Sequence, residues 1–116
     1  MQKSIYRIAA VAVVLVAGSA AAQDRTGYQA IATGSLASAE AKINAERAIF
    51  PDRPELMLNL AAIYARTDRV AQARALYQDV LSRASVALDM PSGTVESSHV
   101  VAERGLSRLS ASVAAR

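Results

Sequence analysis

The chain matches itself when it is shifted by 34 residues, which aligns segment 34–43 with segment 68–77. Both segments begin with a residue suited to a tight turn and continue with apolar residues three and four apart, the spacing of one helix face. The aligned pairs are Gly34 with Asp68, Leu36 with Val70, Ala39 with Ala73, and Ile43 with Tyr77. A repeat of this length indicates stacked helix pairs, because a single pair cannot bury its apolar face.

A further helix is predicted immediately before the second copy. Its apolar stripe consists of Met57, Leu60, Ala61 and Tyr64. Pro54 stands near the start of this helix, where a missing backbone N–H costs little. Asp52 is placed to cap the free amides of the first turn. We therefore predict a mainly all-α fold that is built from antiparallel helix pairs.

The order of these residues resembles the signature of the tetratricopeptide repeats, which runs from a bulky residue through Leu-Gly and Tyr to Ala, an aromatic residue and Pro over about 34 residues. The matching slots are held by Met57, Leu60, Ala61, Tyr64, Ala73 and Tyr77. Met57 replaces the usual tryptophan, Ala61 and Asp68 replace glycines, and Ser85 replaces the closing proline. Aspartate tolerates a left-handed backbone better than most residues, so Asp68 is compatible with the turn.

The resemblance covers residues 54–81 and the second helix of an earlier repeat, 35–49, but it fails over 23–33. It implies one clear repeat after a degenerate or truncated one. We expect the small residues Ala39, Ala61 and Ala73 at the closest helix crossings, with Leu60, Tyr64, Tyr77, Val80 and Leu81 filling the space around them. The alternative is that two unrelated amphipathic helix pairs share this spacing by chance.

Residues 85–116 form a C-terminal extension of the repeat region, which we place at about 23–84. Pro91-Ser92-Gly93-Thr94 is a turn signal, and the weak alternation before it predicts a short extended pair or an irregular excursion. Ser97 or Ser98 is expected to cap a final helix from about His99 to Ala114. The apolar face of that helix should cover the exposed end of the repeat, as terminal elements of repeat stacks do.

Residues 1–22 have the three parts of a secretory signal peptide. Lys3 and Arg7 form a cationic start, the segment 8–17 is wholly apolar, and Ala20-Ala21-Ala22 supplies small residues before a cut. This pattern predicts an exported protein, periplasmic or secreted if bacterial, that meets a membrane only transiently. The mature domain would then be 23–116. An uncleaved anchor, an organellar transit peptide and a buried helix are the alternatives.

The composition argues against several classes of function. Lys3 and Arg7 are two of the 13 basic residues, so 11 basic side chains face 10 acidic ones after position 22, and no basic field for nucleic acid remains. The chain has no cysteine and one histidine, which excludes disulfides and thiolate metal sites. Ser97-Ser98-His99 suggests a nucleophile and a base, but neighbours on a helix point about 100° apart, and a triad needs spatial neighbours. We predict no enzyme activity, cofactor or metal.

The resemblance implies a protein–protein interaction module whose first helices line a concave groove for a peptide or partner protein. Carried over to this chain, the groove-facing candidates are Glu55, Leu58, Asn59, Ala62, Ala65 and Arg66. They lie off the apolar stripe, which gives a separate reason to expect that they are exposed. Asn59 would bond a peptide backbone and Arg66 a carboxylate. Arg104 and Arg108, one turn apart, either repel each other in solvent or hold an acidic partner.

Two other functions remain open at this stage. Too few repeats and an incomplete first helix leave a face that a second copy of the chain would cover, which predicts self-association. The remaining alternative is an envelope enzyme whose turnover depends on His99.

Overall fold

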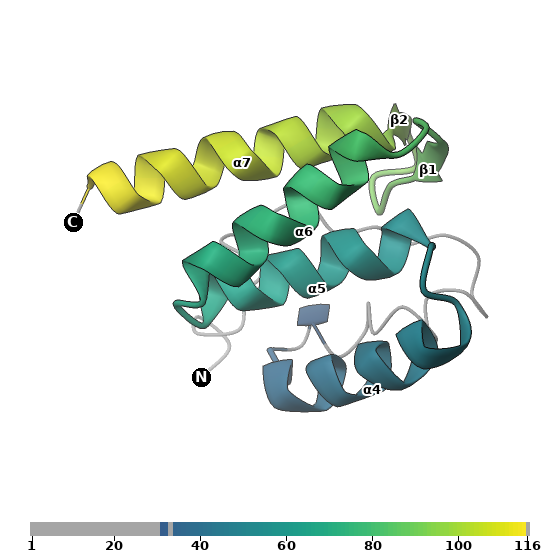
Figure 1. Ribbon diagram of the computed structural model, residues 1–116, viewed down its shortest axis with the longest axis horizontal. Coiled ribbons are helices and arrows are strands. Elements are labelled where there is room, and N and C mark those ends of the chain that lie inside the picture. Colours follow the sequence, from purple (N-terminus) through teal and green to yellow (C-terminus); the bar gives the residue numbers. More distant parts are fainter. Residues whose placement is uncertain (1–30, 33, 116) are drawn as a thin grey trace.

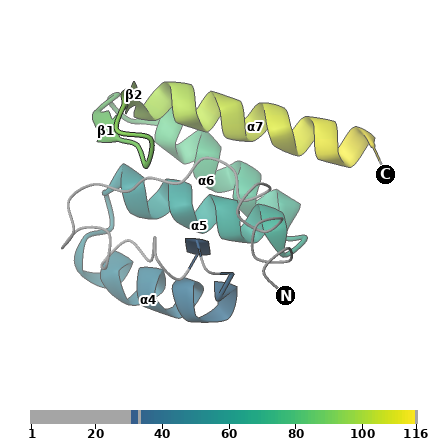
Figure 2. The same cartoon turned by 180° about the vertical axis from the view of Figure 1, so that it is seen from behind.

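The computed structural model describes residues 31, 32 and 34–115. The elements within these residues are α4 (Leu36–Ile49), α5 (Pro54–Arg66), α6 (Val70–Ser82), β1 (Ala87–Asp89), β2 (Val95–Ser97) and α7 (Ser98–Ala114). Successive helices run antiparallel and lie side by side, and the hairpin joins α6 to α7 at one end of the stack (Figures 1 and 2). The predicted mainly helical fold with an extended pair before the last helix is confirmed. The predicted signal peptide, 1–22, lies outside the described residues.

The turns before α4 and α6 have the same backbone conformation. Gly34 has φ = 85° and Asp68 has φ = 66°, so both adopt the left-handed conformation at the offset that the sequence predicts. Aspartate reaches this region more readily than most residues with a side chain, which is why it can replace glycine here. The two helices therefore start in equivalent ways.

The start of α5 differs in one detail from the prediction. Pro54 occupies the first turn as expected, but Arg53 is the N-terminal capping residue, and no side chain accepts a capping hydrogen bond. The carboxylate of Asp52 instead accepts a hydrogen bond from Nη1 of Arg83 at 2.5 Å. The predicted capping role of Asp52 is wrong, because the guanidinium at the end of α6 competes for the same carboxylate.

The three small residues that were expected at the helix crossings are buried. Ala39, Ala61 and Ala73 are all completely buried. An alanine adds no side chain beyond Cβ, so backbones can come near one another, and larger residues fill the surrounding space. Tyr77 and Val80 are also buried, as predicted.

The buried residues form two clusters that meet along α5. One cluster joins α4 to α5 and contains Ile31, Ala39, Ile43, Leu56, Leu60, Ala62 and Ile63. The other joins α5 to α6, the hairpin and α7, and contains Met57, Leu58, Ala61, Ala73, Tyr77, Val80, Leu88, Met90, Val101, Ala102 and Leu109. Because α5 contributes to both, it is the central helix of the fold.

The hairpin closes around the predicted turn. The N–H of Gly93 donates to the carbonyl of Met90 at 2.9 Å, and Gly93 has φ = 89°, a conformation that glycine adopts at no steric cost. Ala87 pairs with Ser97 at the open end of the hairpin. The hydroxyl of Ser97 accepts a hydrogen bond from the N–H of Val100 at 3.1 Å, which confirms the predicted cap of the last helix.

An ion pair connects α4 to the start of α6 and gives a prediction about pH. Arg69 donates from Nη1 and Nη2 to the two carboxylate oxygens of Glu40 at 2.9 and 2.5 Å, and its guanidinium lies 4.4 Å from the centre of the Tyr64 ring. The hydrogen bonds from Arg69 lower the pKa of Glu40 below 4.5. The carboxylate therefore stabilises the fold above pH 4.5, and this contribution is lost as the pH falls through the lowered value.

Glu40→Gln is accordingly expected to lower the urea midpoint of unfolding at neutral pH, with a difference from the unchanged protein that shrinks below pH 4.5. Glu103→Gln removes an exposed carboxylate from α7 and serves as the control. A Glu40→Gln difference that stays constant with pH, or that matches the control, would show that the ion pair does not stabilise the fold.

Candidate functional site

The structure does not expose the predicted groove residues of α5. Leu58, Asn59 and Ala62 are 1%, 0% and 1% exposed, so the expectation that they face solvent is wrong. Glu55, Ala65 and Arg66 are half-buried. The stretch from Leu56 to Ile63 is buried without interruption, because α4 covers one side of α5 while α6 and α7 cover the others.

The last helix covers the face that a groove would need. Leu58 belongs to the same buried cluster as Val101, Ala102 and Leu109 of α7. Ala62 belongs to the opposite cluster, with residues of α4. Half of the six residues that the resemblance implies as ligand contacts are thus core residues in this chain.

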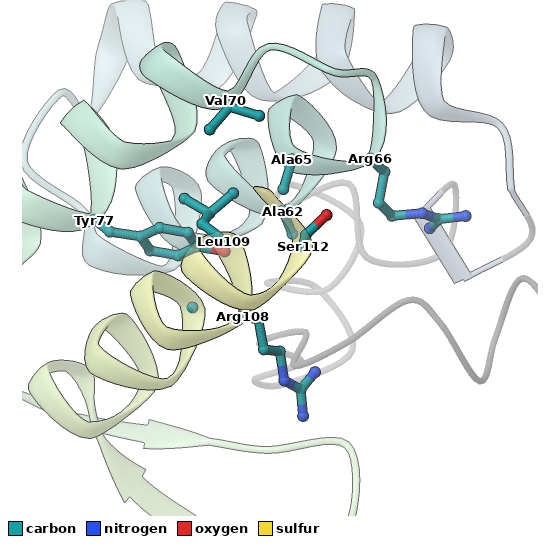
Figure 3. A pocket seen from close by; sticks show the side chains of 9 residues that line it. Ala62, Ala65, Arg66, Val70, Tyr77, Arg108, Leu109 and Ser112 are labelled. Atoms are coloured by element: carbon teal, nitrogen blue, oxygen red, sulfur yellow. The ribbon is translucent and has the colours of Figure 1, made fainter. Parts of the chain in front are cut away.

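A cavity of about 240 Å³ lies at the C-terminal end of α5. It lies between α5, the start of α6 and the second half of α7 (Figure 3). Its lining consists of Ala62, Ala65, Arg66, Val70, Tyr77, Gly105, Arg108, Leu109 and Ser112. Three of the six predicted groove residues therefore border it, and the rest of the lining comes from α6 and α7, which the groove prediction did not include.

Gly105 allows the ring of Tyr77 to pack directly on the backbone of α7. A Cβ atom at this position would stand 2.3 Å from Cζ of Tyr77, well inside van der Waals contact. A glycine in a helix interior costs about 1 kcal/mol relative to alanine, so its presence there often has a packing reason. A glycine in the interior of the predicted last helix was therefore the sequence feature from which this contact could have been inferred.

Tyr77 forms one wall of the cavity and is 3% exposed. Burial raises the pKa of the Tyr77 phenol to about 12, while the positive charge of Arg108 acts weakly in the opposite direction. The phenol is therefore neutral at physiological pH and adds no negative charge to the cavity.

Gly105→Ala tests this contact. Overpacking of a buried site costs roughly 1–3 kcal/mol, and the higher helix propensity of alanine returns about 1, so we expect a net loss of up to about 2 kcal/mol of unfolding free energy. Urea denaturation followed by circular dichroism measures it. In the background of Tyr77→Leu the same glycine replacement should cost less, because the ring is gone. Equal costs in both backgrounds would contradict the packing of Tyr77 on Gly105.

Two arginines border the cavity from different helices. The stems of Arg66 in α5 and Arg108 in α7 line it, and their guanidinium groups extend away from Tyr77 (Figure 3). Nη1 of Arg66 is buried and has no hydrogen-bond partner among the described residues, and burial lowers the pKa of this guanidinium. An unpaired buried donor of this kind typically costs about 1–3 kcal/mol. A ligand that accepts a hydrogen bond from Arg66 would remove that cost.

Arg104 and Arg108, which the sequence places one turn apart, have different roles in the structure. Arg104 donates from Nη2 to a carboxylate oxygen of Glu96 at 2.6 Å, so it is held by the hairpin. Within residues 31, 32 and 34–115, Arg108 forms no ion pair. Of these two arginines, only Arg108 is therefore placed to receive an acidic group at the cavity.

The Ser97-Ser98-His99 sequence has structural partners. Besides the cap that Ser97 forms, the hydroxyl of Ser98 accepts from the N–H of Val86 at 3.0 Å, and Nε2 of His99 lies 2.7 Å from the carbonyl oxygen of Arg83. These contacts connect the hairpin and the end of α6 to the start of α7. In the part of the chain that the structure describes, no three histidine or acidic side chains are grouped to hold a metal.

Comparison with protein-family models, with curated proteins and with solved structures finds no match. Among the helices that the structure describes, none is both long and apolar enough to cross a bilayer.

Proposed function

We propose that this chain is an exported protein-binding module with tetratricopeptide-like helix pairs, which binds a segment of a partner protein rather than catalysing a reaction. The observation that carries the proposal is the cavity between α5, α6 and α7, which has an apolar interior and arginines at its edge. Ligand sites in proteins are commonly concave and largely apolar, with a few polar groups that orient the ligand.

The spacing of the helices supports the tetratricopeptide-like part of the proposal. The helices α4 and α6 begin at Leu36 and Val70, 34 residues apart, after equivalent left-handed turns. The helix α7 begins 44 residues after α5, from Pro54 to Ser98, and the hairpin accounts for the additional residues. The same offset aligns Ala61 with Gly105, both small and buried. This agreement supports α7 as the first helix of a further, incomplete pair.

The size of the cavity limits what it can bind. About 240 Å³ is below the roughly 300–1,000 Å³ of sites that enclose a drug-sized ligand. It suits one side chain of a partner segment better than a whole cofactor. We therefore expect modest affinity from this cavity alone.

Site-specific crosslinking in cells that express the full chain tests the proposal. A photo-crosslinking amino acid at Ser112, which is exposed at the cavity, should give a discrete protein adduct, whereas the same group at the exposed Ala41 of α4 should not. Ala65→Leu should fill the cavity and suppress the adduct, while Ala71→Leu on the exposed face of α6 should not. Equal labelling from Ser112 and Ala41, or no adduct at all, would count against the binding function.

One observation favours self-association as a second candidate. Ile49, at the end of α4, is 66% exposed, and α4 packs mainly against α5 among the described elements. A second copy of the chain could cover Ile49. Light scattering at high micromolar concentration should then report a dimer that Ile49→Asp dissociates, and a monomer under these conditions would remove this candidate.

A further inference from the structure

We infer that the partner segment is acidic and inserts one apolar side chain into the cavity between α5, α6 and α7. This inference rests on the proposed binding function and adds the chemistry of the ligand. Three observations support it: the distribution of charge around the cavity, its apolar lining and the direction in which the two arginines extend.

The arginines at the cavity differ from three others in the described part of the chain. Arg66 and Arg108 border the cavity, and none of the nine described residues that line it is acidic. Three other arginines are each neutralised within the fold by a carboxylate. They are Arg69 with Glu40, Arg83 with Asp52 and Asp79, and Arg104 with Glu96. The cavity is therefore a place where positive charge is left uncompensated, and a carboxylate from outside the chain would compensate it.

The interior of the cavity favours an apolar group of the ligand over a charged one. Ala62, Ala65, Val70 and Leu109 contribute its apolar surface, and the neutral Tyr77 closes one side. Burying an aliphatic side chain against this surface is favourable, whereas burying a carboxylate there would remove its hydration. The apolar group of the ligand therefore belongs inside and its charges outside.

The positions of the side chains also place the charged contacts apart from the apolar ones. The guanidinium groups of Arg66 and Arg108 lie on separate helices and point away from Tyr77 (Figure 3), and Arg108 is exposed, whereas Nη1 of Arg66 is buried. Arg66 lies in the last turn of α5, whose carbonyl groups carry partial negative charge, so an anion is favoured at the guanidinium tips rather than at the helix end. A segment with acidic residues on both sides of an apolar one matches this arrangement.

Binding of amidated peptide libraries tests the inference with the protein purified from cells that express the full chain. The first library has a central leucine or methionine flanked by aspartate and glutamate, and its ends are amidated so that only side chains carry the charge. The second library replaces the acidic positions by lysine, and the third replaces the central residue by serine. Fluorescence polarisation measures the affinity of each.

The acidic library with the apolar centre should bind at least about tenfold more tightly than either of the others, and its affinity should fall as salt is raised. Arg108→Gln should weaken its binding about three- to tenfold. Arg53→Gln, which removes a positive charge at the N-terminal end of α5, the end opposite to the cavity, should change it less than twofold. Equal binding of the acidic and basic libraries, or equal effects of the two arginine replacements, would overturn the inference.

Competition with adduct formation separates this inference from the proposed function. If the acidic library, added to a cell lysate before irradiation, prevents the adduct from forming at Ser112, both are supported. If Ala65→Leu suppresses the adduct but the acidic library does not prevent its formation, the binding site stands and the acidic ligand is wrong. If no adduct forms from Ser112, the proposed function itself fails.

Discussion

Replacing Leu58 by alanine is expected to lower the free energy of unfolding by about 2–5 kcal/mol, the range for a large aliphatic side chain removed from a core. Leu58 is 1% exposed and shares a buried cluster with residues of α6 and α7. The alanine variant loses the buried methyl groups and leaves a space that the surrounding helices fill only in part. Urea denaturation at constant pH, followed by circular dichroism, measures the change.

Ile49→Ala is the matched control for this experiment, because Ile49 is 66% exposed and its replacement should change stability by less than about 0.5 kcal/mol. The comparison decides between two positions of α7. If Leu58→Ala is as mild as the control, then Leu58 faces an open groove, α7 does not cover α5, and the cavity described above does not exist.

Ala73→Trp is expected to destabilise the protein by roughly 1–3 kcal/mol or more, because extra volume in a packed interior forces side chains and backbone to move. Ala73 is completely buried in the cluster between α5, α6 and α7. A tryptophan there would push α6 away from its neighbours. Thermal unfolding should show a clearly lower melting temperature. Fluorescence should show that the new indole is exposed to quenchers.

Ala71→Trp provides the control on the exposed face of the same helix, and it should leave the melting temperature nearly unchanged. A thermally silent Ala73→Trp would mean that the pairing of α5 with α6 is wrong. Since the predicted tetratricopeptide-like arrangement depends on that pairing, the proposed function would lose its structural basis as well.

Much of the fold could be predicted from the amino-acid sequence because the signals are local. Apolar residues three and four apart predicted the helices, and the offset between Gly34 and Asp68 predicted two equivalent turns, which the structure shows with positive φ at both residues. The turn around Gly93 and the cap at Ser97 were also correctly predicted. Each of these features depends on residues a few positions apart, so a short window of sequence contains the required information.

The candidate site was predicted only in part. Ala65 and Arg66 do border the cavity, but Leu58 and Asn59 are core residues. The prediction treated residues off the main apolar stripe of α5 as exposed. That inference holds for a helix with neighbours on one side, and it fails for α5, which other helices cover on several sides.

The sequence by itself determined which segments are helical, where they turn and how the last helix is capped, since backbone propensity and hydrophobic period act over neighbouring residues. The sequence also predicted that the last helix covers the repeat of residues 54–81, and α7 does pack on α6 and α5. The tertiary structure alone decided that α7 also helps to bury Leu58 and brings Arg108 to the same cavity as Arg66, 42 positions earlier in the chain. The physical reason is that an apolar stripe specifies that a face must be buried, without specifying which side chains meet there. Those contacts are set by long-range packing, here in part by the fit of Tyr77 against Gly105.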